Sequence, residues 1–109
     1  MKVDIQTDSD VSIVRPAGKL DALTSPKFQE SLDRILNDGV QRIVIDMSQI
    51  EYVSSAGLRV FVIIAKRLMA NGQLIVAACA PSVKQVFELA GFPILMTICD
   101  DVTEAKSLA

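Results

Sequence analysis

The sequence has no histidine, no tryptophan and only two cysteines among its 109 residues. Without histidine, the serine–histidine and cysteine–histidine pairs that activate a catalytic nucleophile cannot form. No cluster of cysteine and acidic residues has the spacing of a metal site, and neither a GxGxxG nor a P-loop pattern for phosphate binding is present. Paired catalytic carboxylates, built from acids at strand ends, stay open as an alternative. The sequence therefore predicts a protein that is not an enzyme and binds no metal.

Charge and hydropathy exclude further classes of protein. Eleven basic and thirteen acidic side chains give a net charge of −2, and only 5% of residues are aromatic, so a nucleic-acid-binding face is not expected. No apolar stretch approaches the roughly 20 residues that span a bilayer, and the charged start MKVDIQTDSD lacks the apolar core of a secretory signal. Cys79 and Cys99 are isolated in apolar runs, as small buried residues of a reduced protein are. We expect a cytoplasmic protein with neither nucleic acid nor membrane as partner.

Alternating hydrophobic patterns predict one α/β domain with the order ββαβαβαβα. Half of the residues are hydrophobic, enough for a core at this chain length. An opening antiparallel hairpin followed by alternating strands and helices favours a mixed, mostly parallel sheet flanked by helices. The expected strands cover residues 3–7, 11–15, 41–48, 73–80 and 92–100, and the expected helices cover 24–39, 58–70, 81–91 and 101–109.

Single residues mark several boundaries of these elements. Gly18 indicates a bend or bulge after the second strand. Ser25 is a candidate cap for the first helix, Pro26 suits its first position, and Gly39 suits a left-handed end.

The stretch EYVSSAGLRV, residues 51–60, places two serines and a glycine before an apolar helix. Either hydroxyl, of Ser54 or Ser55, can accept a hydrogen bond from an unpaired amide at the helix start, and most serines in this position are only caps. Gly57 costs about 1 kcal/mol of helix propensity relative to alanine. Its missing side chain permits close approach of a neighbouring strand or of a partner protein. Both interpretations of the serines and of the glycine stay open.

One side of the following helix combines basic and apolar residues. At about 100° per residue, Ser55, Arg59, Lys66 and Arg67 fall on this side, with Ile63 between the basic residues and Val62 at their edge. Branched apolar side chains rimmed by basic ones indicate a contact patch for a partner protein, although a nearby loop could instead cover them.

A phosphate on Ser55 would act as a switch for such a patch. It adds about −1.5 to −2 charges, and the start of its own helix tolerates an anion. Arg59 is also within reach, four residues on. A docked partner would meet a hydrated anion, and a penalty of about 3 kcal/mol would lower its affinity roughly a hundredfold.

The stretch IVIDMSQIEYVSSAGLRVFV, residues 43–62, resembles the signature of the STAS domain family, the anti-sigma factor antagonists. That signature is a strand ending D-x-S, here Asp46 and Ser48, then an apolar-containing loop and D-S-[ST]-G-L. GKLDALTSPKF resembles the family segment G-x-[LIV]-D, and APSVKQVFELAGF resembles its segment of proline, apolar helix and glycine. The resemblance extends over essentially the whole chain and implies a single STAS domain over residues 1–109.

The resemblance implies that Ser55 is the phosphoacceptor. The acidic residue that the family usually has before it is replaced by Ser54, which becomes the second choice for the kinase. The hydroxyl residue that usually follows is replaced by Ala56, so an alternative acceptor is lost. Asp21 matches the acid of the G-x-[LIV]-D segment, which lies near the phosphoacceptor in the family fold.

The resemblance also implies a partner-switching function. The unphosphorylated domain binds an anti-sigma factor that is a serine kinase and so frees a sigma factor; phosphorylation abolishes binding, and a PP2C-type phosphatase restores it. ATP belongs to the kinase, so no cofactor is expected in this chain. The chain is also expected to be a monomer. One alternative is an unphosphorylated scaffold subunit of another assembly, such as a lipid transporter, and another is an unrecognised enzyme or small-ligand binder. The expected partner-binding residues are Asp21, Ser54, Gly57, Arg59, Val62, Ile63 and Lys66.

Overall fold

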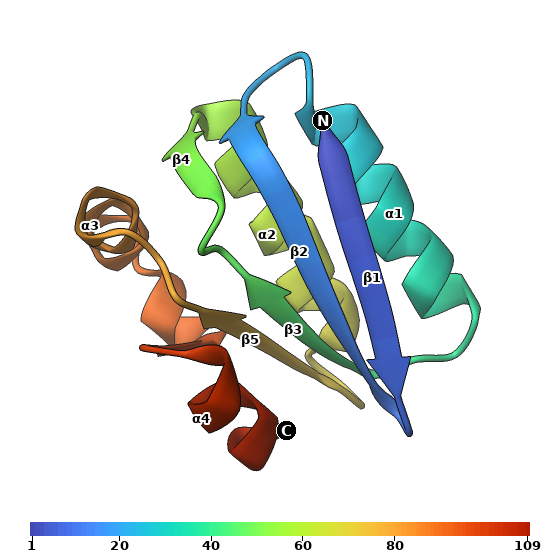
Figure 1. The fold of residues 1–109 in the computed structure, drawn as a ribbon. Helices are drawn as coiled ribbons and strands as arrows, with labels where there is room; N and C mark the ends of the chain where they lie inside the picture. Colours follow the sequence, from blue (N-terminus) through green and yellow to red (C-terminus); the bar gives the residue numbers. More distant parts are fainter.

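A six-stranded mixed sheet forms the centre of the computed structural model, which describes all of residues 1–109, and helices lie on both faces of the sheet (Figure 1). The predicted α/β class is confirmed. In chain order the elements are β1 (Lys2–Asp8), β2 (Val11–Leu20), α1 (Ser25–Asn37), β3 (Arg42–Asp46), β4 (Ile50–Val53), α2 (Ser55–Leu68), β5 (Gln73–Ala77), α3 (Pro81–Leu89), the 3₁₀ turn η1 (Phe92–Ile94), β6 (Thr97–Cys99) and α4 (Val102–Leu108).

The main path of the sheet runs β1-β2-β3-β5-β6. β1 and β2 pair antiparallel across a turn at Ser9, whose φ of 57° is left-handed, so the predicted hairpin is confirmed. β2, β3, β5 and β6 are parallel to one another. Parallel neighbours bring their carboxyl ends to the same edge of the sheet, and this edge positions the candidate site.

The sequence prediction missed β4, which makes the observed order ββαββαβαβα. β4 lies off the main path and pairs in parallel with the end of β2, with Gly18 opposite Ile50 and Leu20 opposite Val53. The register shifts between Gly18 and Lys19, and Gly18 has a φ of +106°. The expected bulge at Gly18 is therefore confirmed, and it lets β2 bend and continue to Leu20 beside a second partner.

The prediction of a last strand over residues 92–100 was largely wrong. Only Thr97–Cys99 forms a strand, and Phe92–Ile94 forms a 3₁₀ turn after Gly91, whose φ is +78°. Pro93 has no amide hydrogen to donate to a sheet, which explains why the strand starts later.

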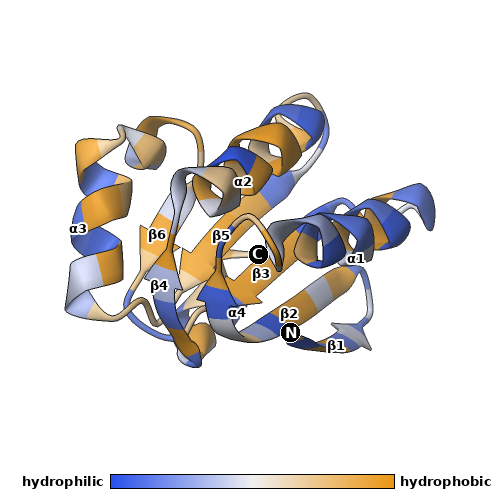
Figure 2. Cartoon of the chain, turned by 90° about the horizontal axis from the view of Figure 1, so that it is seen from above, coloured by the Kyte–Doolittle hydropathy of each residue, from blue (hydrophilic) through white to orange (hydrophobic).

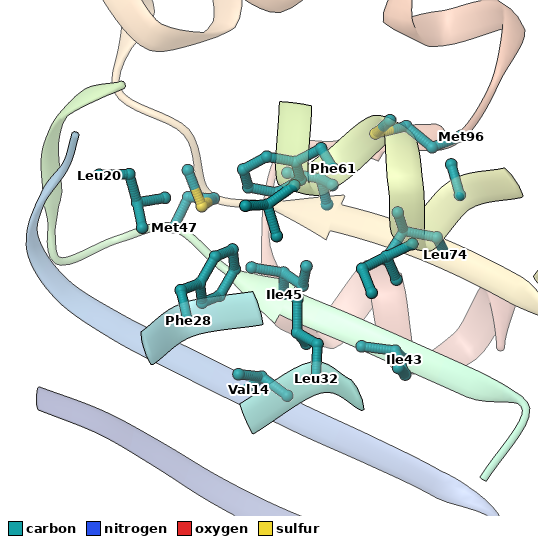
Figure 3. Packing of buried hydrophobic residues seen from close by; sticks show 14 of the residues in the cluster. Val14, Leu20, Phe28, Leu32, Ile43, Ile45, Met47, Phe61, Leu74 and Met96 are labelled. Carbon is teal, nitrogen blue, oxygen red and sulfur yellow. The ribbon is translucent and has the colours of Figure 1, made fainter. Parts of the chain in front are cut away.

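The main core lies between the sheet and α1, α2 and α3 (Figure 2). The rings of Phe28 in α1 and Phe61 in α2 are tilted against each other with centroids 5.6 Å apart (Figure 3). The ring of Phe87 in α3 lies 5.0 Å from that of Phe61 in an edge-on arrangement. This aromatic row ties three helices to one another.

A smaller core lies on the opposite face, where Ala105 of α4 packs on Val44 and Ile75. Cys99 is buried in this second cluster, whereas Cys79 packs against the main one. Burial raises the pKa of the Cys79 thiol to about 11 and also raises the pKa of the Cys99 thiol, so neither cysteine is a reactive thiolate at neutral pH.

Candidate functional site

The site lies where β2 and β4 end and α2 begins (Figure 1). The amide of Ser54 donates a hydrogen bond to the carbonyl of Leu20 at 2.8 Å. Asp21 follows Leu20, and Ser55 follows Ser54. The structure therefore brings Asp21 and the serine pair to one edge, although more than 30 positions separate them in the chain.

Ser54 and Ser55 occupy different structural positions. Ser54 is the N-cap of α2, with extended backbone, and its hydroxyl accepts a hydrogen bond from the amide of Gly57 at 3.4 Å. Its carbonyl accepts from the amide of Leu58 at 2.9 Å. Ser55 is the first residue of the helix and is exposed. The cap is therefore Ser54, and the hydroxyl at the surface is that of Ser55.

Gly57 is buried and does not belong to an exposed contact surface, which corrects its prediction as a partner-binding residue. A Cβ atom at this position would lie 2.9 Å from the Cβ and the carbonyl oxygen of Leu20 and 2.9 Å from Cγ1 of Val53. Real Cβ atoms do not approach other atoms so closely. The absence of a side chain is required because α2 packs directly on the ends of β2 and β4.

Asp21 holds the loop between β2 and α1. Its carboxylate oxygen Oδ1 accepts from the amides of Thr24 at 3.1 Å and Leu23 at 3.0 Å. These bonds, that of Thr24 first, keep the pKa of the Asp21 carboxyl below its usual value. The Thr24 hydroxyl in turn donates to the carbonyl of Lys19 at 2.6 Å. Asp21 is thus an ionised, fixed group beside the serines.

Ser25 is not the cap that the sequence suggested. The N-cap of α1 is Thr24, and the Ser25 hydroxyl is buried without a hydrogen-bond partner. The expected left-handed end at Gly39 is present, with a φ of +93°.

Asp46 and Ser48 form a structural turn rather than part of the site. Asp46 is buried at the end of β3, where Nε of Arg15 donates to Oδ2 at 2.7 Å and the amide of Ser48 donates to Oδ1 at 3.0 Å. Burial raises the pKa of the Asp46 carboxyl, but the bonds from Ser48 and Arg15 outweigh this effect and the pKa lies below its usual value. Since alternate residues of a strand face opposite sides, Asp46 shares the face of Val44, opposite α2.

The exposed side of α2 carries Ser55, Arg59, Ile63 and Lys66, which we call the α2 outer face. Ser55, Arg59 and Lys66 are exposed, and Ile63 is half-buried without being among the side chains that pack against either core. Val62 is also half-buried but packs against the main core.

Arg67 is not part of the exposed basic side of α2 on which the sequence pattern had placed it. Its guanidinium pairs with Asp33 of α1 at 2.6 Å and donates to Asn37 at 3.4 Å. It therefore joins the two helices instead of facing a partner.

The sequence reasoning missed two exposed apolar side chains at the same end of the molecule. Leu23, in the loop held by Asp21, is 90% exposed, and Tyr52 of β4, two residues before Ser54, is 53% exposed. An apolar residue between an acid and a helix start, as in DALTSP, is the signal that could have revealed Leu23.

Comparison with known proteins identifies the family. The model of the STAS domain family matches residues 2–105. The chain belongs to the STAS domain family. BtrV of Bordetella bronchiseptica, described as a candidate anti-sigma factor antagonist, is 31% identical over 93 residues, which are 84% of this chain and 80% of that protein.

Solved structures show the same fold. The crystal structure of a candidate anti-sigma factor antagonist from Thermotoga maritima has a TM-score of 0.91 and 24% identity, over 96% of this chain and 92% of that one. The phosphorylated form of the Bacillus cell fate determinant SpoIIAA has a TM-score of 0.77 and 15% identity, over 99% of this STAS chain and 100% of that one.

Two further findings concern catalysis and membrane-spanning helices. STAS anti-sigma factor antagonists are not enzymes, and the chain is a member of their family. None of its helices combines the length and the apolar character that crossing a membrane requires.

Proposed function

We propose that this STAS domain is an anti-sigma factor antagonist that binds an anti-sigma factor serine kinase when unphosphorylated and is released when Ser55 is phosphorylated. The observation that carries the proposal is the exposed hydroxyl of Ser55 at the start of α2, on the same face as Arg59, Ile63 and Lys66. The relatives with this description, together with a phosphorylated form of SpoIIAA, support it.

Ser55 is the preferred phosphate acceptor because the hydroxyl of the neighbouring Ser54 is already used as the cap of α2. The Ser54 hydroxyl accepts a hydrogen bond from the Gly57 amide, and Ser54 is half-buried. A kinase would therefore have to open the helix cap to reach this hydroxyl. Ala56, on the other side, has no hydroxyl. Ser54 stays the second choice.

The docking surface extends beyond the α2 outer face. Leu23 and Tyr52 present apolar surface at the end of the molecule where Ser55 lies, while Arg59 and Lys66 supply positive charge. Apolar anchors with a basic rim fit a partner surface that is apolar at its centre and acidic around it. Asp21 contributes by fixing the loop that presents Leu23.

Phosphorylation would abolish binding without refolding the domain. The phosphate would stand outside the helix, where the exposed amides and the macrodipole tolerate an anion. A partner covering the same surface would have to remove water from that anion and from the apolar side chains beside it, at a cost of several kcal/mol. ATP is bound by the kinase, and a PP2C-type phosphatase would restore the binding form, all within the cytoplasm and with this chain as a monomer.

The test incubates the purified domain with ATP and the serine kinase encoded beside its gene, followed by intact-mass measurement and peptide mapping. We expect one phosphate on Ser55, none in Ser55→Ala, and normal phosphorylation of Ser55 in Ser54→Ala. A kinase that binds the domain but never phosphorylates it would overturn the switch and favour a scaffold subunit of another assembly.

A further inference from the structure

We propose that Arg59 binds the phosphate of phosphorylated Ser55 within the same helix, so that phosphorylation adds an anion to the docking surface and also withdraws a cation from it. The inference rests on the proposed function, because it concerns the phosphorylated state of Ser55. It identifies Arg59 as a residue with a different role in each state of the switch.

The spacing of the two residues suits a contact within one helix. Ser55 and Arg59 are four positions apart in α2 and both are exposed. Residues four apart lie one above the other on a helix surface. An anion placed N-terminal to its cation is the more favourable order, since the helix dipole stabilises the negative group near the N-terminus.

Arg59 is the only arginine of the chain without a carboxylate partner. The protein has five arginines, and four of them form ion pairs within 4.0 Å. These pairs are Arg15 with Asp46, Arg34 with Glu30, Arg42 with Asp10 and Arg67 with Asp33. The guanidinium of Arg59 is therefore available, and its planar pair of donors matches two phosphate oxygens.

Within α2, no other charged group competes closely for either member of the pair; on the neighbouring β2, the exposed Lys19 is a further cation at this end of the molecule. The Asp21 carboxylate is directed to the amides of Leu23 and Thr24, and the residue before Ser55 is a serine rather than an acid. Lys66 is eleven residues from Ser55, about 16 Å along the helix axis, which is too far for an ion pair. In the phosphorylated protein, the new dianion and Arg59 would be each other's nearest charged partners within α2.

The test places phosphoserine at position 55 during translation, so that no kinase is needed, and titrates the phosphate by phosphorus NMR. A free phosphoserine has a second pKa of about 6. We expect the pKa in the folded domain to be lower, and Arg59→Gln to raise it by roughly 0.3 pH unit, the shift that one helical ion pair corresponds to.

Lys66→Gln is the matched control, because it removes one positive charge from the same helix face at a distance. It should leave the titration unchanged, and high salt should remove most of the difference caused by Arg59→Gln. Identical titrations of the parent and Arg59→Gln would overturn the pairing, as would an equal shift in Lys66→Gln. This result is independent of the kinase assay, which tests the proposed function by itself.

Discussion

At the scale of single residues, the adjacent Ser54 and Ser55 differ in backbone conformation, hydrogen bonding and exposure. Ser54 has extended backbone and turns its hydroxyl toward the Gly57 amide, whereas Ser55 has entered the helix and is exposed. Gly57 completes the arrangement because only a residue without a Cβ lets α2 approach Leu20. A helix cap, an exposed serine and a close backbone contact thus lie within four consecutive positions.

We predict that Gly57→Ala destabilises the domain. Alanine improves helix propensity by about 1 kcal/mol, but its Cβ would lie 2.9 Å from Leu20 and Val53. Displacing α2 from the strand ends should cost more than that gain, for a net loss of about 1–2 kcal/mol. Urea unfolding measures the effect, and a variant as stable as the parent would show that the contact has room to relax.

We predict that Asp46→Asn lowers stability by about 2 kcal/mol at pH 7, because it weakens the charged hydrogen bonds with Arg15 and Ser48. The folded pKa of Asp46 lies below its usual 3.8, so the ionised group stabilises the fold above that pH. This stabilisation is lost as the pH falls through the folded pKa. The difference between the two proteins in urea unfolding should therefore be full at pH 7 and smaller at pH 3.

Glu30→Gln provides the control for that comparison, since it removes an exposed pair with Arg34 and should cost no more than about 0.5 kcal/mol. A deficit of Asp46→Asn that stays constant down to pH 3 would contradict the role given to ionisation.

At the scale of elements, α2 has two opposed faces, one buried and one exposed. Val60, Phe61 and Ile64 face the core, while the α2 outer face stays free of the chain's own packing. The helical period of the sequence was sufficient to predict the exposed side with Ser55, Arg59 and Lys66. It could not reveal that Arg67 pairs with Asp33, because that contact depends on where α1 lies.

We predict that the two serines respond differently to removal of the hydroxyl. Ser54→Ala removes the N-cap and should lower the free energy of unfolding by about 1 kcal/mol. Ser55→Ala, at an exposed position, should change it by less than about 0.5 kcal/mol. Chemical denaturation of both variants checks this. A larger loss of stability in Ser55→Ala than in Ser54→Ala would show that Ser55, and not Ser54, has the structural role.

We predict that Ile63→Glu weakens binding of the anti-sigma factor kinase by at least tenfold while the thermal midpoint changes little. Ile63 is half-buried on the α2 outer face, and a carboxylate there would be desolvated by the partner. Calorimetric titration measures the affinity. Arg34→Gln on α1 is the control, and unfolding of Ile63→Glu would show instead that Ile63 belongs to the core.

The elements that the sequence failed to predict are those that depend on distant partners. β4 has only four residues and exists because the bulge after Gly18 turns the end of β2 toward it. β6 is short because Pro93 and the preceding 3₁₀ turn occupy the rest of the apolar run. The hairpin, the first helix and the central strands were predictable because their hydrophobic periods and end signals are local.

At the scale of the whole molecule, the site occupies one edge of a rigid sheet. The strand ends carry the loop of Asp21 and the start of α2, and the main core behind them is closed by three helices. Such a site can change its charge without changing the fold. The proposed switch would therefore act on the partner and leave the domain intact.

The most direct test of this account is a calorimetric titration of the anti-sigma factor kinase with three forms of the protein: unmodified, Ser55→Ala, and phosphorylated at Ser55. We predict that the first two bind with similar affinity, and that the phosphorylated form binds at least a hundredfold more weakly, with an unchanged circular dichroism spectrum. Equal binding by the phosphorylated form would contradict the central claim that a phosphate at the start of α2 blocks the partner.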